Sequence, residues 1–253
     1  MSRGLGDVYK RQSMIRVPEF DEEKYLVMVT KQGIIKRISL NAYNTARKGG
    51  LIALELNEGD ELAWVRLTDG NQQVIVATKN GLAIRFEETD VRPMGRQARG
   101  VKAISLREGD CVVGMCVVTN DDLILTASET GFGRISNVSD YRLQSRGGKG
   151  ITNYHTEKYG NVAAVSAVKL DEDIIIISQE GVIIRIAADT VRICNRPSKG
   201  VTLMRIGEND KVVTVARAPH EDSESEKTEE TAEEETSEEN TAPETNAEEN
   251  TEE

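Results

Sequence analysis

Short apolar runs, rather than long amphipathic stretches, make up most of the chain between residues 24 and 218. Runs such as 74–77 and 174–177 are rich in β-branched residues and are bounded by Gly, Asn and Asp. Such runs are too short for helices and are typical of strands joined by tight turns. In the second of four similar units they predict strands at 73–78, 82–86, 101–106 and 111–118. Four such units predict sixteen strands.

The unit repeats with a nearly constant period. A first phrase occurs as VMVTKQGIIKRI, VIVATKNGLAIRF, LILTASETGFGRI and IIIISQEGVIIRI, and its glycines are Gly33, Gly81, Gly131 and Gly181. A second phrase occurs as ARKGGLIALEL, GRQARGVKAISL, SRGGKGITNY and RPSKGVTLMRI, with glycines at 50, 100, 150 and 200. A third element, Gly-Asp before a strand, stands at 59–60 and 109–110 and is looser at 160–161 and 209–210. The whole unit is therefore repeated.

The period predicts the fold class. Four strands in a repeat of roughly 40–50 residues are typical of propeller-like arrays, in which each blade buries a face against its neighbour. We therefore expect an all-β fold of four blades. The glycines of the first phrase are expected to take a positive φ in hairpin turns. Trp64 is expected to pack between blades.

Charge divides the chain into two parts. Residues 219–253 hold 16 acidic residues against Lys227 alone, and no Val, Ile, Leu, Phe, Tyr or Trp. Such a tail is expected to be disordered, and it could be a solubilising extension or a polyanion that folds back on the basic residues of the chain and competes with an anionic partner. The remaining residues carry a net charge of +4. Residues 1–12 do not fit the repeat and are expected to be a non-native or unstructured leader, which leaves 13–218 as the folded domain.

Several classes of function find no support in the sequence. Cys111, Cys116 and Cys194 lie in apolar runs, as buried reduced cysteines do, and indicate neither a disulfide framework nor a zinc site. His155 and His220 have no convincing catalytic partner, so we expect neither catalysis nor a cofactor in this chain. No apolar run is long enough to span a membrane, which favours a cytoplasmic location.

Basic residues recur at matched positions in the second phrase, and they are the candidate site. If the blades are related by a rotation, these side chains form a curved basic band that suits the phosphates of a bent duplex. The alternative is that they are ordinary solvated loop residues. The candidates are Arg47, Lys48, Arg92, Arg96, Arg99, Lys102, Arg142, Arg146, Lys149, Arg192, Arg196 and Lys199.

One of these phrases resembles a known family. QSRGGKG at 144–150 is similar to the Gln-Arg-Arg-Gly-Gly-Lys-Gly box of DNA gyrase A C-terminal domains, from which only Ser145 departs. Residues 86–110 and 124–150 and the acidic tail also resemble this family, and the resemblance covers about residues 24–218. By position, Gln144, Arg146, Gly147, Gly148, Lys149 and Gly150 match the box.

The resemblance implies a β-pinwheel, in which blades exchange strands and the outer edge wraps duplex DNA. It implies partnership with the rest of gyrase A and with gyrase B in an A2B2 enzyme that supercoils DNA with ATP. Since family members usually have six blades, the chain is expected to hold the last four, with the principal box outside it. Two alternatives remain open: the A subunit of topoisomerase IV, and a propeller-like scaffold that binds proteins and not DNA.

Overall fold

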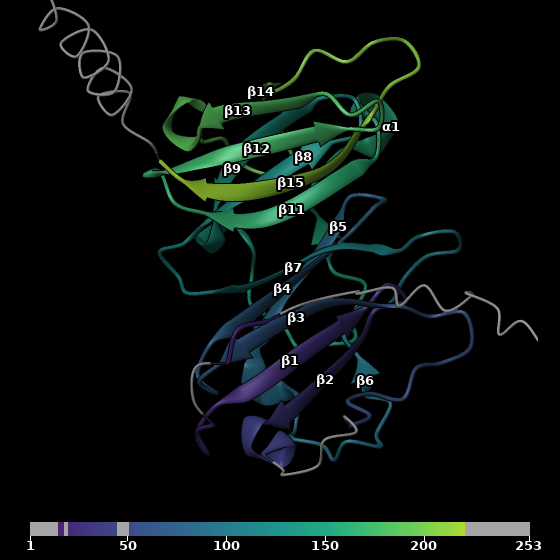
Figure 1. The fold of residues 1–253 in the computed structure, drawn as a ribbon. Helices are drawn as coiled ribbons and strands as arrows, with labels where there is room; N and C mark the ends of the chain where they lie inside the picture. Colours follow the sequence, from purple (N-terminus) through teal and green to yellow (C-terminus); the bar gives the residue numbers. More distant parts are fainter. Residues whose placement is uncertain (1–14, 18–19, 45–50, 221–253) are drawn as a thin grey trace, which may run out of the picture. The chain divides into compact units, whose positions relative to one another are not determined.

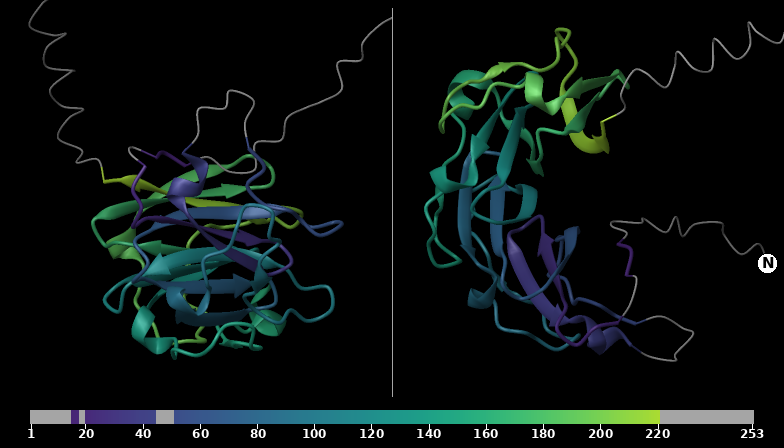
Figure 2. Two further views of the ribbon diagram at one scale, coloured as in Figure 1. Left: turned by 90° about the horizontal axis from the view of Figure 1, so that it is seen from below. Right: turned by 90° about the vertical axis from the view of Figure 1, so that its left-hand side faces the viewer.

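The structure is a computed structural model that describes residues 15–17, 20–44 and 51–220 (Figure 1). The chain separates into two compact units, Met1–Ala218 and Pro219–Glu253. The leader expected at 1–12, and the tail beyond residue 220, lie outside the described residues. Within the first unit the sheets follow one another in chain order, from purple to green (Figure 2). The expected all-β fold of four propeller-like blades is confirmed.

Each sheet is one blade, and the order of strands across a sheet differs from their order along the chain. Blade 1 comprises, from edge to edge, β3 (Leu62–Thr68), β1 (Tyr25–Thr30), β2 (Ile34–Ser39) and β6 (Val101–Lys102). Blade 2 comprises β10 (Ile151–Thr152), β5 (Leu82–Glu87), β4 (Gln73–Thr78) and β7 (Val112–Val118). Blade 3 comprises β11 (Val162–Val168), β8 (Leu123–Ser128), β9 (Phe132–Asn137) and β14 (Val201–Thr202). Blade 4 comprises β13 (Ile183–Ala187), β12 (Glu172–Ser178) and β15 (Val212–Pro219).

Short helical turns complete the regular structure of the described residues, and the strand pattern did not predict them. One 3-10 turn follows the second strand of each hairpin, at η1 (Leu40–Tyr43), η2 (Glu88–Asp90), η3 (Val138–Asp140) and η4 (Ala188–Thr190). A single α-helical turn, α1 (Thr156–Tyr159), precedes β11.

The hairpin turns follow the prediction from the first phrase. Gly33, Gly81, Gly131 and Gly181 have φ values of 78°, 79°, 82° and 87°, a region that L side chains rarely adopt. The aspartate that ends the third sequence element, Gly-Asp or its looser form, stabilises the first, second and fourth of these turns. It accepts a backbone N–H from the turn, in the bonds Gln32 N to Asp60 Oδ1, Asn80 N to Asp110 Oδ1 and Glu180 N to Asp210 Oδ1.

The strand expected at 101–106 was wrongly placed in the second unit's own sheet. Only Val101 and Lys102 form a strand, β6, which pairs with β2 in blade 1. The chain then turns into the core, where Ala103 donates its N–H to Gly33 O (2.8 Å) and Ile104 is 1% exposed. The same exchange places β10 in blade 2 and β14 in blade 3. Sixteen strands were expected, and the described residues form fifteen, with none at 51–56.

The core lies between successive blades rather than within them. One apolar cluster combines Val29 and Ile35 of blade 1 with Val76 and Phe86 of blade 2, and Trp64 packs against it, as predicted. A second cluster joins blades 2 and 3, and a third joins blades 3 and 4. A blade therefore depends on its neighbours for burial of its faces.

Candidate nucleic-acid interface

The predicted basic residues lie mainly on three loops, 91–100, 141–150 and 191–200, which we call the rim loops. Each rim loop runs beside the second hairpin strand of the preceding blade. This contact includes a parallel bridge, at Arg37–Pro93, Arg85–Leu143 and Ile135–Ile193. Each rim loop also donates one backbone N–H to this strand. The N···O distances are 2.8 Å from Met94 to Arg37, 3.0 Å from Gln144 to Arg85 and 2.8 Å from Cys194 to Ile135. The loops therefore take equivalent places, at the sheet edges opposite β3, β7 and β11.

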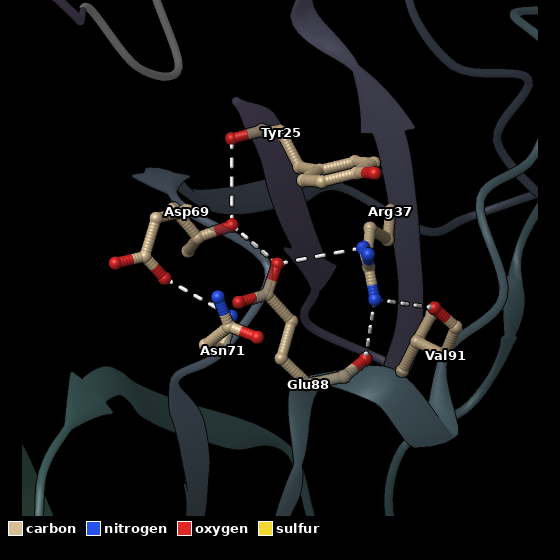
Figure 3. Close-up of polar contacts among 7 residues, drawn as sticks. Tyr25, Arg37, Asp69, Asn71, Glu88 and Val91 are labelled. Atoms are coloured by element: carbon tan, nitrogen blue, oxygen red, sulfur yellow. Dashed lines mark hydrogen bonds and ion pairs between the residues drawn. The ribbon is translucent and has the colours of Figure 1, made fainter. Parts of the chain in front are cut away.

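A buried arginine anchors the start of the first rim loop (Figure 3). Arg37 in β2 donates to the carbonyls of Glu88 (3.3 Å) and Val91 (3.5 Å), and its Nε lies 3.4 Å from Glu88 Oε1. Its guanidinium also lies 3.9 Å from the centre of the Tyr25 ring. Buried charges are tolerated only when they are paired and hydrogen-bonded, as Arg37 is in this blade.

Arg85 repeats this anchor one blade further on. It lies in β5 and donates Nη1 to the carbonyls of Val138 (2.9 Å) and Tyr141 (3.0 Å). Val138 lies just before the second rim loop and Tyr141 is its first residue, as Glu88 and Val91 are placed at the first rim loop. Two successive rim loops are thus fixed to the preceding blade by a guanidinium.

A second pair of buried cations holds the rim loops further along. Lys36 has no exposed surface and donates Nζ to the carbonyls of Ala53 (2.8 Å) and Arg96 (2.6 Å). Burial lowers the pKa of this ammonium. Arg134, equally buried, donates Nε to Ser198 O at 3.1 Å. Both residues stand three positions after a hairpin glycine, and both bind a rim-loop carbonyl. The charge pattern of the sequence did not reveal this role.

Arg146 and Arg196 make matched contacts with the protein itself. Arg146 donates to Asp90 O (3.0 Å) and Lys102 O (3.2 Å). Arg196 donates to Asp140 O (2.8 Å) and Thr152 O (2.5 Å), which are the same positions fifty residues on. Both side chains are partly exposed. Arg96, at the same phase, is also partly exposed. Arg146 and Arg196 therefore take equivalent places on their loops, and both help to fix the loop.

Three other arginines, which stand at equivalent positions of the fifty-residue repeat, are exposed. Arg92, Arg142 and Arg192 each stand one residue after the buried Val91, Tyr141 and Val191. Within the described residues they make no hydrogen bond or ion pair. Their guanidinium groups are free to bind an anion.

The exposed cations at the ends of the rim loops have more varied surroundings. Arg99 forms an ion pair with Glu55 at 2.9 Å, and Lys102 on β6 is exposed. Lys149 makes no ion pair within the part of the chain that the structure describes. Lys199 lies 3.6 Å from the centre of the Phe132 ring, in a hollow of about 760 Å³ that Arg192 and Arg196 also line. Arg47 and Lys48 lie outside the described residues.

The box-like segment 144–150 packs closely on the protein's own backbone. Gly147 (φ 79°) donates its N–H to Ala103 O, and Gly148 O accepts from Ser105 N. Gly150 has φ 74°, and a Cβ there would lie 2.5 Å from Ala83 O. A Cβ at Gly100 would lie equally close to the carbonyl oxygen of Ile35, at 2.6 Å. The glycines at 100 and 150 are therefore required by strand exchange, whether or not phosphate also approaches the loop.

Two features are absent from the described residues, a cluster of metal ligands and a helix that could cross a membrane. They contain no group of three or more His, Cys, Asp or Glu side chains placed to hold a metal ion. No helix among them combines the length and apolar character that crossing a membrane requires.

The blades, their exchanged strands and the recurrent rim-loop cations define a class: a propeller-like repeat protein with cations at one edge of its sheets. A model of the DNA gyrase C-terminal domain, described as a β-propeller, matches residues 24–69, 72–118, 122–169 and 172–219. These matches cover most of the chain, one for each blade. The chain belongs to the DNA gyrase A C-terminal domain family, and the resemblance seen in the sequence is confirmed.

Individual relatives agree with the family. The DNA gyrase A protein of Clostridium acetobutylicum is 56% identical over 93 residues, 37% of this chain and 11% of that protein. The DNA gyrase A protein of Synechocystis is 45% identical over 95 residues, again 37% of this chain and 11% of that protein. The matched part thus spans about a tenth of these relatives.

Solved structures show the same fold. The C-terminal domain of a DNA topoisomerase IV aligns with a TM-score of 0.77 at 26% identity, over 87% of this chain and 69% of that one. A DNA gyrase A C-terminal domain aligns with a TM-score of 0.71 at 28% identity, over 80% of this chain and 68% of that one.

Proposed function

We propose that the blades bind duplex DNA along the rim loops, without reading its sequence, and hold it in a bend. On this proposal the chain is the DNA-wrapping part of a gyrase A protein. It acts with the rest of gyrase A and with gyrase B, in an A2B2 enzyme, to introduce negative supercoils with ATP. The observation that supports it best is the exposed, unpaired arginine at the same place on three successive rim loops, Arg92, Arg142 and Arg192.

The chemistry of these side chains suits phosphate. A guanidinium presents a planar fork of donors that matches a phosphate oxyanion, and it remains charged at any physiological pH. Contacts with phosphate position a duplex but do not read its bases. The buried cations Lys36, Arg37, Arg85 and Arg134 hold the loops by their carbonyls. The exposed arginines therefore stand on a preorganised surface.

The relatives favour gyrase over topoisomerase IV as the parent enzyme. The sequence relatives described above are DNA gyrase A proteins, at up to 56% identity. The solved structures include both enzymes at similar identity, 26% and 28%, so the fold alone does not separate them.

The test is a titration of a duplex of ~150 base pairs, about one persistence length, at several salt concentrations. Each phosphate contact contributes about 0.9 to the slope of log affinity against log salt concentration. We expect the triple variant Arg92→Gln, Arg142→Gln, Arg192→Gln to bind less tightly and to lose about 2.7 of that slope.

The matched control changes the same net charge at another edge of the sheets. Arg66 lies in β3, Arg217 in β15 and Lys169 just after β11, and all three are exposed. Arg66→Gln, Lys169→Gln, Arg217→Gln is expected to keep the wild-type slope. Equal losses in both triple variants would contradict a DNA interface on the rim loops and leave only the effect of net charge.

A further inference from the structure

An exposed apolar residue follows the free arginine on each rim loop. Leu143 is 49% exposed and Ile193 is 44% exposed, and Pro93 is exposed as well. A single exposed apolar side chain is common on protein surfaces and needs no explanation. A set that recurs at one position of a repeat, beside a free cation each time, indicates a shared role. The pairs are Arg92 and Pro93, Arg142 and Leu143, and Arg192 and Ile193.

The backbone of these apolar residues is fixed at the same place beside each blade. Each of them forms the parallel bridge of its rim loop, so that its partner in the preceding blade is Arg37, Arg85 or Ile135. The next residue along the loop donates its N–H to the carbonyl of that partner. Backbone contacts therefore hold the loop at these positions, and the exposed side chains stand on a preorganised support.

On the third rim loop the apolar residue forms part of the hollow of about 760 Å³. Ile193 lines this hollow together with the cations Arg192, Arg196 and Lys199. No aspartate or glutamate of the described residues contributes to the lining. The surface therefore combines positive charge with apolar contact area, and it suits a partner that carries negative charge and apolar surface side by side.

We propose that Pro93, Leu143 and Ile193 pack against deoxyribose rings of the duplex, while the arginine beside each of them binds a neighbouring phosphate. The backbone of DNA alternates the two chemistries that each rim loop pairs, because every phosphate is joined to a sugar whose carbon-bound hydrogens form an apolar face. Neither contact reads a base, so binding stays independent of sequence. This inference rests on the proposed function, and it adds a source of affinity that charge does not supply.

Charge and apolar contact can be measured apart because they depend differently on salt. Phosphate contacts release counterions, so their contribution to log affinity falls as log salt concentration rises. Burial of apolar surface releases no counterions and is not weakened by salt. Loss of the apolar side chains should therefore lower the affinity by the same factor at every salt concentration, whereas loss of the arginines changes the slope.

The experiment repeats the duplex titration on the whole chain with the double variant Leu143→Ala, Ile193→Ala. We expect its affinity to be about 20-fold lower than that of the wild type, from two half-exposed side chains that the duplex would bury. The slope against salt should stay that of the wild type. The conservative variant Leu143→Met, Ile193→Leu keeps the apolar surface and should bind as the wild type does.

A matched control removes apolar side chains of similar exposure from other places. Leu170 lies in the turn before β12 and Val213 in β15, and they are 44% and 51% exposed. Leu170→Ala, Val213→Ala should keep the wild-type affinity, and every variant should keep the wild-type thermal unfolding transition because the substituted side chains are half exposed.

The outcomes separate this inference from the function on which it rests. Suppose that Arg92→Gln, Arg142→Gln, Arg192→Gln loses slope while Leu143→Ala, Ile193→Ala binds as the wild type does. The apolar contact would then be refuted, the DNA interface would stand, and the apolar residues would be left to a protein partner. A change of slope in the apolar double variant would also overturn the inference, because these side chains would then act only by placing the arginines.

Discussion

Charged residues inside the blades bind backbone carbonyls of distant segments. Lys36 and Arg37 are adjacent in β2, and both are buried, because each face of blade 1 meets other parts of the chain. The sequence shows a basic pair within an apolar run, which predicts the strand. It does not predict the partners, since the carbonyl that Lys36 reaches in Arg96 is sixty residues away. These roles follow only once strand exchange has placed the rim loop over the preceding blade.

Cys116 gives a test of burial at the scale of one residue. It lies in β7 at 4% exposure, and burial raises the pKa of its thiol to about 11 from the ordinary 9.0. The folded state therefore keeps this proton above pH 9 while the unfolded state releases it, so stability is full below pH 9 and is lost as pH rises. By pH 11 we expect the unfolding free energy of the wild type to have fallen by about 2 kcal/mol more than that of Cys116→Val.

Denaturant titrations of both proteins from pH 8 to pH 11 would measure this difference. Tyrosines and lysines titrate in both proteins and cancel in the comparison. Parallel pH profiles would show that the Cys116 thiol is not desolvated in the folded chain.

At the scale of strands and blades, the exchange of strands is what the sequence pattern predicts least well. The repeat gives the phase of every strand, and the hairpins β1–β2, β4–β5, β8–β9 and β12–β13 fall where the first phrase predicts them. The second phrase yields strands of only two residues, such as β6, which are too short for alternation to show. A period also does not say which blade a strand joins. The pinwheel exchange was expected from family resemblance, and the pairing of β6 with β2 bears it out.

The close approach of exchanged segments predicts an unequal cost for two similar substitutions. Gly150 (φ 74°) and Gly109 (φ 72°) have nearly the same backbone conformation. A Cβ at Gly150 would lie 2.5 Å from Ala83 O, whereas a Cβ at Gly109 meets nothing within 4 Å. Gly109→Ala should lower the unfolding free energy by about 1 kcal/mol. Gly150→Ala should lower it by at least about 2 kcal/mol more, because the strand must move away from β5.

Thermal or denaturant unfolding of the two variants provides the measurement. Equal losses would mean that β10 does not lie against β5 as closely as the structure has it.

At the scale of the whole molecule, the repeat places cations of the same sequence position on equivalent rim loops. The fifty-residue phase of Arg92, Arg142 and Arg192 was visible in the sequence, and the structure places all three at the start of equivalent rim loops. What the sequence did not separate is the role of each cation. Arg146 and Arg196 bind carbonyls of the protein, while Arg92, Arg142 and Arg192 make no hydrogen bond or ion pair within the described residues. DNA contact by this second group remains a prediction.

The most direct test of that prediction is a measurement of DNA topology. Closed circular plasmid is relaxed by a separate topoisomerase in the presence of increasing amounts of the chain, the protein is removed, and the linking number is read from the topoisomer distribution. A chain that wraps duplex should shift the mean linking number in proportion to the bound protein. Arg92→Gln, Arg142→Gln, Arg192→Gln should lose most of the shift, and Arg66→Gln, Lys169→Gln, Arg217→Gln should keep it. A wild-type chain that binds the plasmid but leaves its linking number unchanged would contradict wrapping.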